Sequence, residues 1–148
     1  MFFITKSIES GNPYLYTLSM DSVVVSANFD LWKTALLSRK PQSVAALYTK
    51  NATLLPTMGQ KVITNSEGIE AYFTFFLAFL PSVSILEEHV MDIAELSYLH
   101  CGMYRFNLTI EGETEQVDAR FSIVWQKIHG EWKIFHHHSS RVPDVRIN

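Results

Sequence analysis

The chain has 148 residues, of which 47% are hydrophobic, 13% aromatic and 18% charged. Its net charge of −3 and pI near 6.0 exclude the basic surface of a nucleic-acid-binding protein and the polybasic patch of a membrane-surface protein. This length predicts one domain whose core needs no disulfide or metal, and the high apolar fraction favours a surface that a partner chain covers.

Residues 1–20 are predicted to be an extension, because the first strong helical pattern begins after them. The apolar start at Met1–Ile4 is interrupted by Lys6 and Glu9, with no small-residue cleavage site, so a signal peptide is not expected. No apolar run reaches the ~20 residues that a membrane helix needs. With Cys101 as the single cysteine, we expect a cytoplasmic protein.

Three helices are predicted next, from apolar residues that recur at helical spacing. Pro41 separates the first two, since proline breaks a helix interior but suits a first turn. The third helix carries too much apolar surface for a helix with one side exposed to solvent. It should therefore contact the sheet on one side and a cavity or a partner on the other. The expected helices cover residues 21–38, 41–50 and 67–79.

The second half of the chain is predicted to be strands joined by hairpins. Helices followed by a strand meander indicate an α+β fold with an antiparallel sheet. Both faces of the long strands carry apolar residues, so one face should hold the helices and the other should meet another subunit. The long strands are expected at 83–94, 96–110, 114–128 and 131–139, with short ones at 53–56 and 61–64.

Several segments resemble SnoaL-like proteins, and most of all the bacterial relatives of the calcium/calmodulin-dependent protein kinase II association domain. The resemblance implies a domain over 21–143, a tail over 144–148, and the cystatin-like cone of the nuclear-transport-factor-2-like superfamily. In that fold, three N-terminal helices and a curved antiparallel sheet enclose a pocket, and subunits associate through the outer sheet face. The segments are Phe29–Leu36, Val44–Tyr48, Ala52–Thr57, Ala119–Phe121, Gly130–Trp132, His136–Ser140 and Pro143.

A ligand pocket is predicted between helices and sheet. The resemblance implies that Arg105 is a pocket arginine that binds a carboxylate, whereas the association domain's other two pocket arginines fall at positions that hold Ile123 and Ser139 here. Strand alternation puts His137 on one face with Phe135 and Ser139, and the resemblance makes that face line the pocket. His137 is the candidate acid or base, since imidazole titrates near neutral pH. The predicted ligand-binding residues are Arg105, His137, Trp32, Tyr48, Tyr72, Phe76 and Ser139.

The neighbouring histidines are expected at the subunit interface. His136 and His138 share the face opposite His137, and a metal site there would need a further ligand such as Asp118. We therefore expect neither a metal nor a cofactor. Arg120 is either a second anion contact in the pocket or, by strand alternation, an outer-face residue paired at a subunit interface with an acidic group, for which Asp118 and Glu95 are the candidates. The predicted interface residues are Arg120, His136, His138, Ser122 and Val124.

The leading hypothesis is a homodimer or larger homo-oligomer, associated through the outer sheet face, that binds a small molecule for which a carboxylate is one candidate group. No kinase activity is expected, because the chain has neither a glycine-rich loop nor a catalytic loop. One alternative is a SnoaL-like enzyme that uses His137 on a polyketide-like substrate. Another is a protein that only assembles into an oligomer and binds no ligand, because side chains fill its vestigial pocket. In the related ketosteroid isomerases, the aspartate that acts as general base follows the short strand after the second helix. The corresponding stretch here, Ala52–Thr57, contains no carboxylate, so isomerase chemistry of that kind is not expected.

Overall fold

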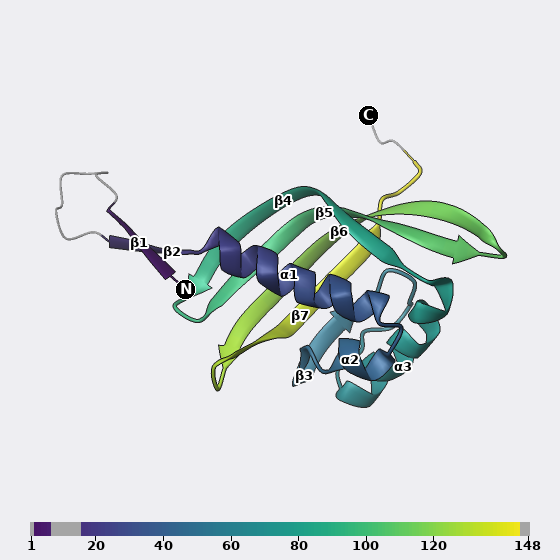
Figure 1. The fold of residues 1–148 in the computed structure, drawn as a ribbon, viewed down its shortest axis with the longest axis horizontal. Coiled ribbons are helices and arrows are strands. Elements are labelled where there is room, and N and C mark those ends of the chain that lie inside the picture. Colours follow the sequence, from purple (N-terminus) through teal and green to yellow (C-terminus); the bar gives the residue numbers. More distant parts are fainter. Residues whose placement is uncertain (1, 7–15, 146–148) are drawn as a thin grey trace.

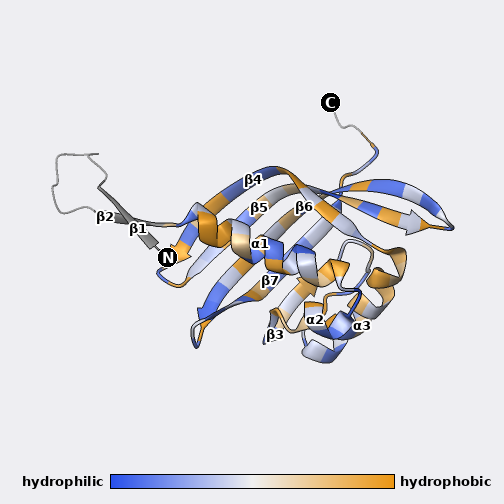
Figure 2. Ribbon diagram, viewed as in Figure 1, coloured by the Kyte–Doolittle hydropathy of each residue, from blue (hydrophilic) through white to orange (hydrophobic). Residues whose placement is uncertain are grey.

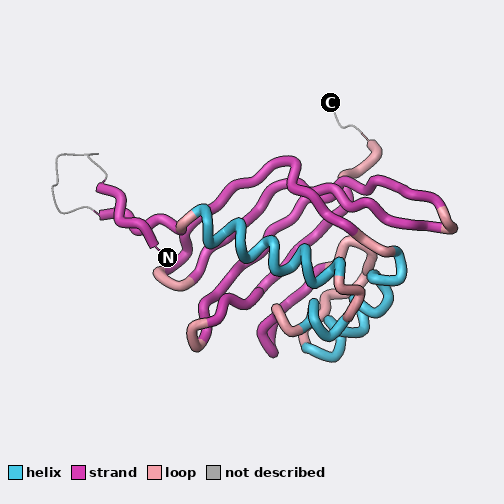
Figure 3. The backbone as a smooth tube through the Cα atoms, in the orientation of Figure 1, coloured by secondary structure: helices cyan, strands magenta, loops and turns pink. Residues whose placement is uncertain are grey.

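A computed structural model of the protein describes residues 2–6 and 16–145, with side chains from residue 20 onward. Helices lie over one face of a five-stranded sheet, and a two-stranded hairpin extends away from this body (Figures 1 and 3). The helices are α1 (Ser22–Leu37), α2 (Pro41–Ala45), α3 (Ser66–Phe76) and the 3-10 helix η1 (Leu77–Phe79). The strands are β1 (Phe2–Lys6), β2 (Tyr16–Met20), β3 (Tyr48–Leu55), β4 (Ser82–Ala94), β5 (Ser97–Ile110), β6 (Glu113–Ile128) and β7 (Glu131–Arg141).

The main sheet has the order β3-β7-β6-β5-β4. The pairs among β4, β5, β6 and β7 are antiparallel, as hairpins require, which confirms the predicted α+β class and its meander of four long strands. Strand β3 runs parallel to β7. The prediction of a purely antiparallel sheet is therefore wrong at this edge, where the two paired strands are separated in the chain by a helix and three strands.

The second helix is shorter than predicted. It ends at Ala45, and β3 already begins at Tyr48, because residues 48–55 find backbone partners along β7. This long-range pairing overrides the local helical pattern over 46–50. The second short strand predicted at 61–64 is reduced to one bridge between Ile63 and Leu54.

Helix α1 spans the sheet diagonally and supplies much of the core (Figure 1). Asp21 caps its first turn, since the carboxylate accepts a hydrogen bond from the backbone N–H of Val23 at 2.8 Å. Phe29, Trp32 and Leu36 recur at helical spacing and are buried against the sheet. Figure 2 shows further apolar residues along α3, which packs on the same side.

Strand alternation divides the sheet into a core face and an outer face. On β5 the buried side chains of the core face are Tyr98, His100, Tyr104, Phe106 and Leu108, and on β6 they are Val117, Ala119, Phe121, Ile123 and Trp125. Residues between these positions point to the outer face, which no helix covers in the part of the chain that the structure describes (Figure 3).

Gly102 permits a sharp bulge between β4 and β5, where the register shifts between Ile85 and Glu87. Its φ is +150°, and a Cβ at this position would lie 2.0 Å from the carbonyl oxygen of Glu87. No side chain fits there, so glycine is required for the two strands to stay paired through the bulge.

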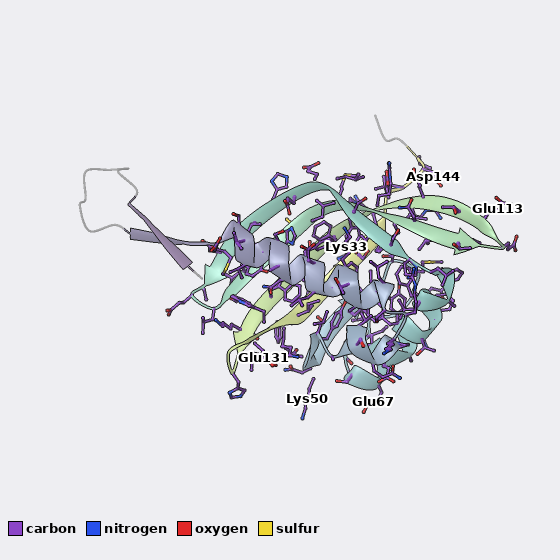
Figure 4. All side chains as sticks on the ribbon, in the orientation of Figure 1. Lys33, Lys50, Glu67, Glu113, Glu131 and Asp144 are labelled. Carbon is purple, nitrogen blue, oxygen red and sulfur yellow. The ribbon has the colours of Figure 1, made fainter. Side chains whose placement is uncertain are left out.

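Two hairpins extend beyond the body of the fold. The β5–β6 hairpin continues past the helices to a hydrophilic tip, where Figure 4 labels Glu113. At the other end β1 and β2 pair with each other, and the backbone N–H of Met20 donates to the Asp92 carboxylate at 2.8 Å. This hydrogen bond ties the base of the N-terminal hairpin to β4.

Candidate functional site

The candidate site surrounds His137, which β7 places on the core face of the sheet. The side chain is 2% exposed and touches aromatic rings on two sides. Trp32 meets it edge-on at 5.3 Å between ring centroids, and Tyr48 stacks on it at 6.1 Å. Helix α1 and strand β3 therefore both hold the imidazole in place.

A chain of hydrogen bonds runs through this cluster, hereafter the His137 cluster (Trp32, Tyr48, Thr57, Tyr104, His137 and Ser139). The Tyr48 hydroxyl lies 2.8 Å from His137 Nδ1, and the Tyr104 hydroxyl lies 3.2 Å from His137 Nε2. Tyr104 in turn donates to Ser139 Oγ at 2.6 Å, and Ser139 contacts the hydroxyl of Thr57. Three strands and the loop after β3 thus meet at one buried polar line.

The donors along this line assign the imidazole tautomer. Trp32 Nε1–H can only donate, and it donates to the Tyr48 oxygen at 3.2 Å. Tyr104 donates its single hydroxyl hydrogen to Ser139, so His137 Nε2 carries the ring proton and donates to the Tyr104 oxygen. In the neutral ring Nδ1 is then the acceptor, and Tyr48 donates its hydrogen to it. Every member has a partner, as buried polar groups require.

Burial keeps the cluster uncharged. Burial, together with the smaller effects of the nearby His136 and His138, lowers the pKa of His137 to about 3. Burial likewise raises the pKa values of Tyr48 and Tyr104. At neutral pH the cluster is a set of neutral donors and acceptors rather than a charged site.

The cavity beside the cluster is nearly filled. Its volume is about 10 Å³, enough for a single water molecule at most. Aromatic and aliphatic side chains from α1, α3 and the sheet close it. Its lining residues are Trp32, Leu54, Pro56, Thr57, Tyr72, Phe73, Phe76, Tyr104, Phe106, His137 and Ser139.

Most of the residues predicted to form the pocket come together here. Trp32, Tyr72, Phe76, His137 and Ser139 line the cavity, and Tyr48 bonds to His137 behind it. Sequence reasoning missed Tyr104 and Thr57. The signal for Tyr104 was present, because strand alternation places it on the same face as the apolar Phe106.

The prediction that Arg105 lies in the pocket is wrong. It follows Tyr104 on β5 and therefore points to the outer face, where its guanidinium donates to Asp118 from Nε at 2.6 Å and from Nη2 at 2.9 Å. These hydrogen bonds lower the pKa of the Asp118 carboxyl. Asp118 is thereby the partner of Arg105 rather than of Arg120.

Phe135 also differs from its predicted position. The register between β6 and β7 shifts after Val124, which pairs with His136, so that Trp125 pairs with Ile134 and Phe135 is left between them. Phe135 is 39% exposed, whereas Ile134 and His137 are buried. The bulge breaks the strict alternation that had put Phe135 and His137 on one face.

The predicted interface residues lie together on the outer face. His138 pairs in register with Ser122 and His136 with Val124, and Arg120 lies one step further along β6. His136 Nδ1 is 2.6 Å from the Thr53 hydroxyl. Among residues 2–6 and 16–145, no group of three or more His, Cys, Asp or Glu side chains is arranged to hold a metal ion. No helix in those ranges is long and apolar enough to cross a membrane.

A second hollow adjoins the His137 cluster at the end of β7. It has a volume of about 300 Å³ between this strand end and the loop after β3, and we call it the cationic groove. Lys61 and Arg141 line it, and no carboxylate does. Pro56, Thr57 and Ser139 line both the groove and the small cavity, so the two are neighbours across the Thr57–Ser139 contact. The full lining is Leu55, Pro56, Thr57, Gly59, Gln60, Lys61, Val62, His138, Ser139, Ser140 and Arg141.

Solved structures show the class of fold. A nuclear transport factor 2-like superfamily protein from Salmonella enterica aligns with a TM-score of 0.73 at 14% identity, covering 84% of this chain and 93% of that one. A putative dehydratase of the NTF2-like family from Streptomyces avermitilis aligns with a TM-score of 0.70 at 13% identity, covering 80% and 94%. The protein therefore has the NTF2-like, cystatin-like fold.

Within this fold the family is also clear. The structure of a putative calcium/calmodulin dependent protein kinase II association domain from Xanthomonas campestris aligns with a TM-score of 0.82 at 38% sequence identity. The alignment covers 86% of this chain and 91% of that one. Residues 21–143 match the calcium/calmodulin dependent protein kinase II association domain family. The chain belongs to that family. A comparison with curated proteins gives no significant match.

Proposed function

We propose that the protein is a homo-oligomeric association-domain protein, without kinase activity of its own, that binds a small carboxylate-bearing molecule at the mouth of the helix–sheet pocket. The observation that carries the proposal is the cationic groove beside the His137 cluster. Its volume of about 300 Å³ is at the lower end of small-molecule sites.

The charges around the groove favour an anion. Lys61 and Arg141 form no ion pair among the described residues, although the whole chain has a net charge of −3. His138 and the hydroxyls of Thr57 and Ser140 offer further hydrogen-bond donors. A carboxylate between the two cations would gain charge-assisted hydrogen bonds from the guanidinium and the ammonium.

The His137 cluster supports binding more than catalysis. A general base works best with a pKa near the working pH, and burial lowers the pKa of His137 to about 3. The adjacent cavity of about 10 Å³ also leaves no room for a substrate next to the ring. These two facts argue against the SnoaL-like enzyme alternative, in which His137 is the acid or base.

The oligomer half of the proposal depends on the outer sheet face. No described helix covers this face, and it carries Val124 and Ser122 half-buried among the histidines and Arg120. Uncovered sheet faces of mixed apolar and polar character are typical of subunit interfaces. Arg120 is exposed on this side, which favours its interface interpretation over a pocket contact.

Binding can be tested by NMR titration of the full chain with sodium hexanoate and, as an uncharged control, hexan-1-ol. We expect hexanoate to shift the backbone amide signals of Thr57, Lys61 and Ser139, and Lys61→Gln or Arg141→Gln to weaken its binding about threefold to fivefold, as expected for exposed charge pairs. Arg105→Gln is the matched control and should leave the affinity unchanged.

Two results would contradict the binding proposal. One is equal binding of hexanoate and hexanol, which would mean that charge has no role. The other is loss of binding in Arg105→Gln alone, which would show that the anion binds to Arg105 on the outer face. Absence of any hexanoate binding would leave the assembly-only alternative.

A further inference from the structure

A separate groove lies between α1 and β4, the strand at the opposite edge of the sheet from β3. It has a volume of about 380 Å³. Its walls include apolar side chains from the helix (Val25 and Phe29) and from the strand (Ile85 and Val90). Figure 4 labels Lys33, which lies along α1 at the edge of this α1–β4 groove.

Two carboxylates face this groove from opposite walls. Asp30 belongs to α1 and Glu88 to β4. Neither forms an ion pair with a lysine or arginine among the described residues, and this includes Lys33 on the same wall as Asp30. The charged residues that line the groove are these two carboxylates and Lys33, so the lining carries a net negative charge and favours a positively charged occupant.

Glu88 is held in place by a buried histidine. His100 Nε2 lies 2.7 Å from a Glu88 carboxylate oxygen, with the imidazole side chain 0% exposed and the carboxylate side chain 52% exposed. The ring is packed edge-on between Phe29 and Phe121, and its Nδ1 has no hydrogen-bond partner. Burial lowers the pKa of His100, so the imidazole orients the carboxylate without cancelling its charge at neutral pH.

The neighbouring residue supplies a natural comparison. Glu87 also contacts a histidine, His89, at 2.8 Å, but both of these side chains are 60% exposed. Glu87 pairs in register with Met103 on the outer face, whereas Glu88 lines the groove. The two adjacent Glu–His pairs therefore differ in burial and in the presence of a cavity.

We propose that the α1–β4 groove is a binding site for a small organic amine, whose ammonium group lies between Asp30 and Glu88 while its apolar part packs on Phe29 and Val90. This site is independent of the cationic groove, which takes ligands of the opposite charge. It uses none of the residues of the His137 cluster.

The test is an NMR titration at low ionic strength with n-hexylammonium chloride, and with hexan-1-ol as the uncharged control. We expect hexylammonium to shift the backbone amide signals of Phe29, Glu88 and Val90 and to bind about threefold to fivefold more tightly than hexanol, the range for half-exposed charge pairs. Hexanoate should not shift these signals.

Glu88→Gln separates a binding role from a purely structural one. The Gln carbonyl oxygen still accepts the hydrogen bond from His100, so the fold is retained while the charge is lost. Hexylammonium binding should weaken about threefold to fivefold, whereas the matched control Glu87→Gln should have no effect. Asp30→Asn should weaken hexylammonium binding to a similar extent. Because Asp30 is at an exposed helix position, this variant still tests the role of charge if Glu88→Gln is unstable.

Equal binding of hexylammonium and hexanol would overturn the proposal, because the groove would then select only apolar surface. Unchanged binding in both Glu88→Gln and Asp30→Asn would overturn it as well. So would amide shifts confined to residues outside the α1–β4 groove.

Discussion

At the scale of single residues, His137 shows how context changes a side chain's chemistry. An isolated imidazole titrates near 6.5, but this ring is 2% exposed and bonded to two tyrosine hydroxyls. Desolvation penalises its charged form, so the ring stays neutral through the physiological range. A histidine that the sequence marks as an acid or base becomes part of a neutral hydrogen-bond chain.

The lowered pKa of His137 predicts a specific pH dependence of stability. Between about pH 6.5 and 3 the unfolded chain binds a proton at His137 that the folded chain does not bind. The free energy of unfolding should therefore fall as the pH drops through this window. His137→Gln removes that contribution, so its cost should be about 2 kcal/mol smaller at pH 5.0 than at pH 7.5. Urea unfolding at the two pH values measures the difference, and an identical cost at both would contradict the prediction.

Arg105 and Tyr104 show what sequence reasoning can and cannot locate at this scale. Family resemblance suggested Arg105 for the pocket, yet the alternation of buried residues along β5 places Tyr104 there. The hydroxyl of Thr57 was harder to anticipate. It reaches Ser139 only because the loop after β3 crosses the end of β7, a contact between residues 82 positions apart.

At the scale of elements, the strands that pair locally were predictable and the strand that pairs at long range was not. The hairpins among β4, β5, β6 and β7 follow from turns and strand patterns, and their bounds differ from the predicted ones by a few residues. Strand β3 pairs with β7 across more than 80 residues of chain, so no local pattern reveals its length or its parallel direction. The bulge at Phe135 is a similar case, since register belongs to two strands together.

The β4–β5 bulge gives a prediction for a single glycine. Gly102→Ala should be strongly destabilising, by about 3 kcal/mol or more, because the new Cβ would collide with the backbone of Glu87 and the strands must separate. Gly130→Ala is the matched control: its φ is +82°, but nothing lies within 4 Å of an added Cβ. That substitution should cost only about 1 kcal/mol for the left-handed backbone. Equal losses in urea unfolding would show that the close approach to Glu87 is unimportant.

At the scale of the whole molecule, the fold divides its surfaces by role. The helices and the core face enclose a nearly filled aromatic cavity, the cationic groove lies beside it, and no helix among the described residues covers the outer face (Figure 3). The fold and the family could be predicted from the sequence, whereas the size of the cavity could not. The arrangement of helices and sheet determines where a cavity can lie, but the packing of individual side chains determines how much of it stays open.

We propose that the protein is a homo-oligomer assembled through the outer sheet face, and its mass in solution tests this most directly. Light scattering coupled to size exclusion, at micromolar concentration, should give a mass of at least twice the 17.0 kDa of one chain. Val124→Glu, which places carboxylates on the outer face, should reduce the mass to that of a single chain, whereas Val23→Glu, at a helix position 70% exposed, should not. A single-chain mass for the unmodified protein, or an oligomer that survives Val124→Glu, would contradict the claim.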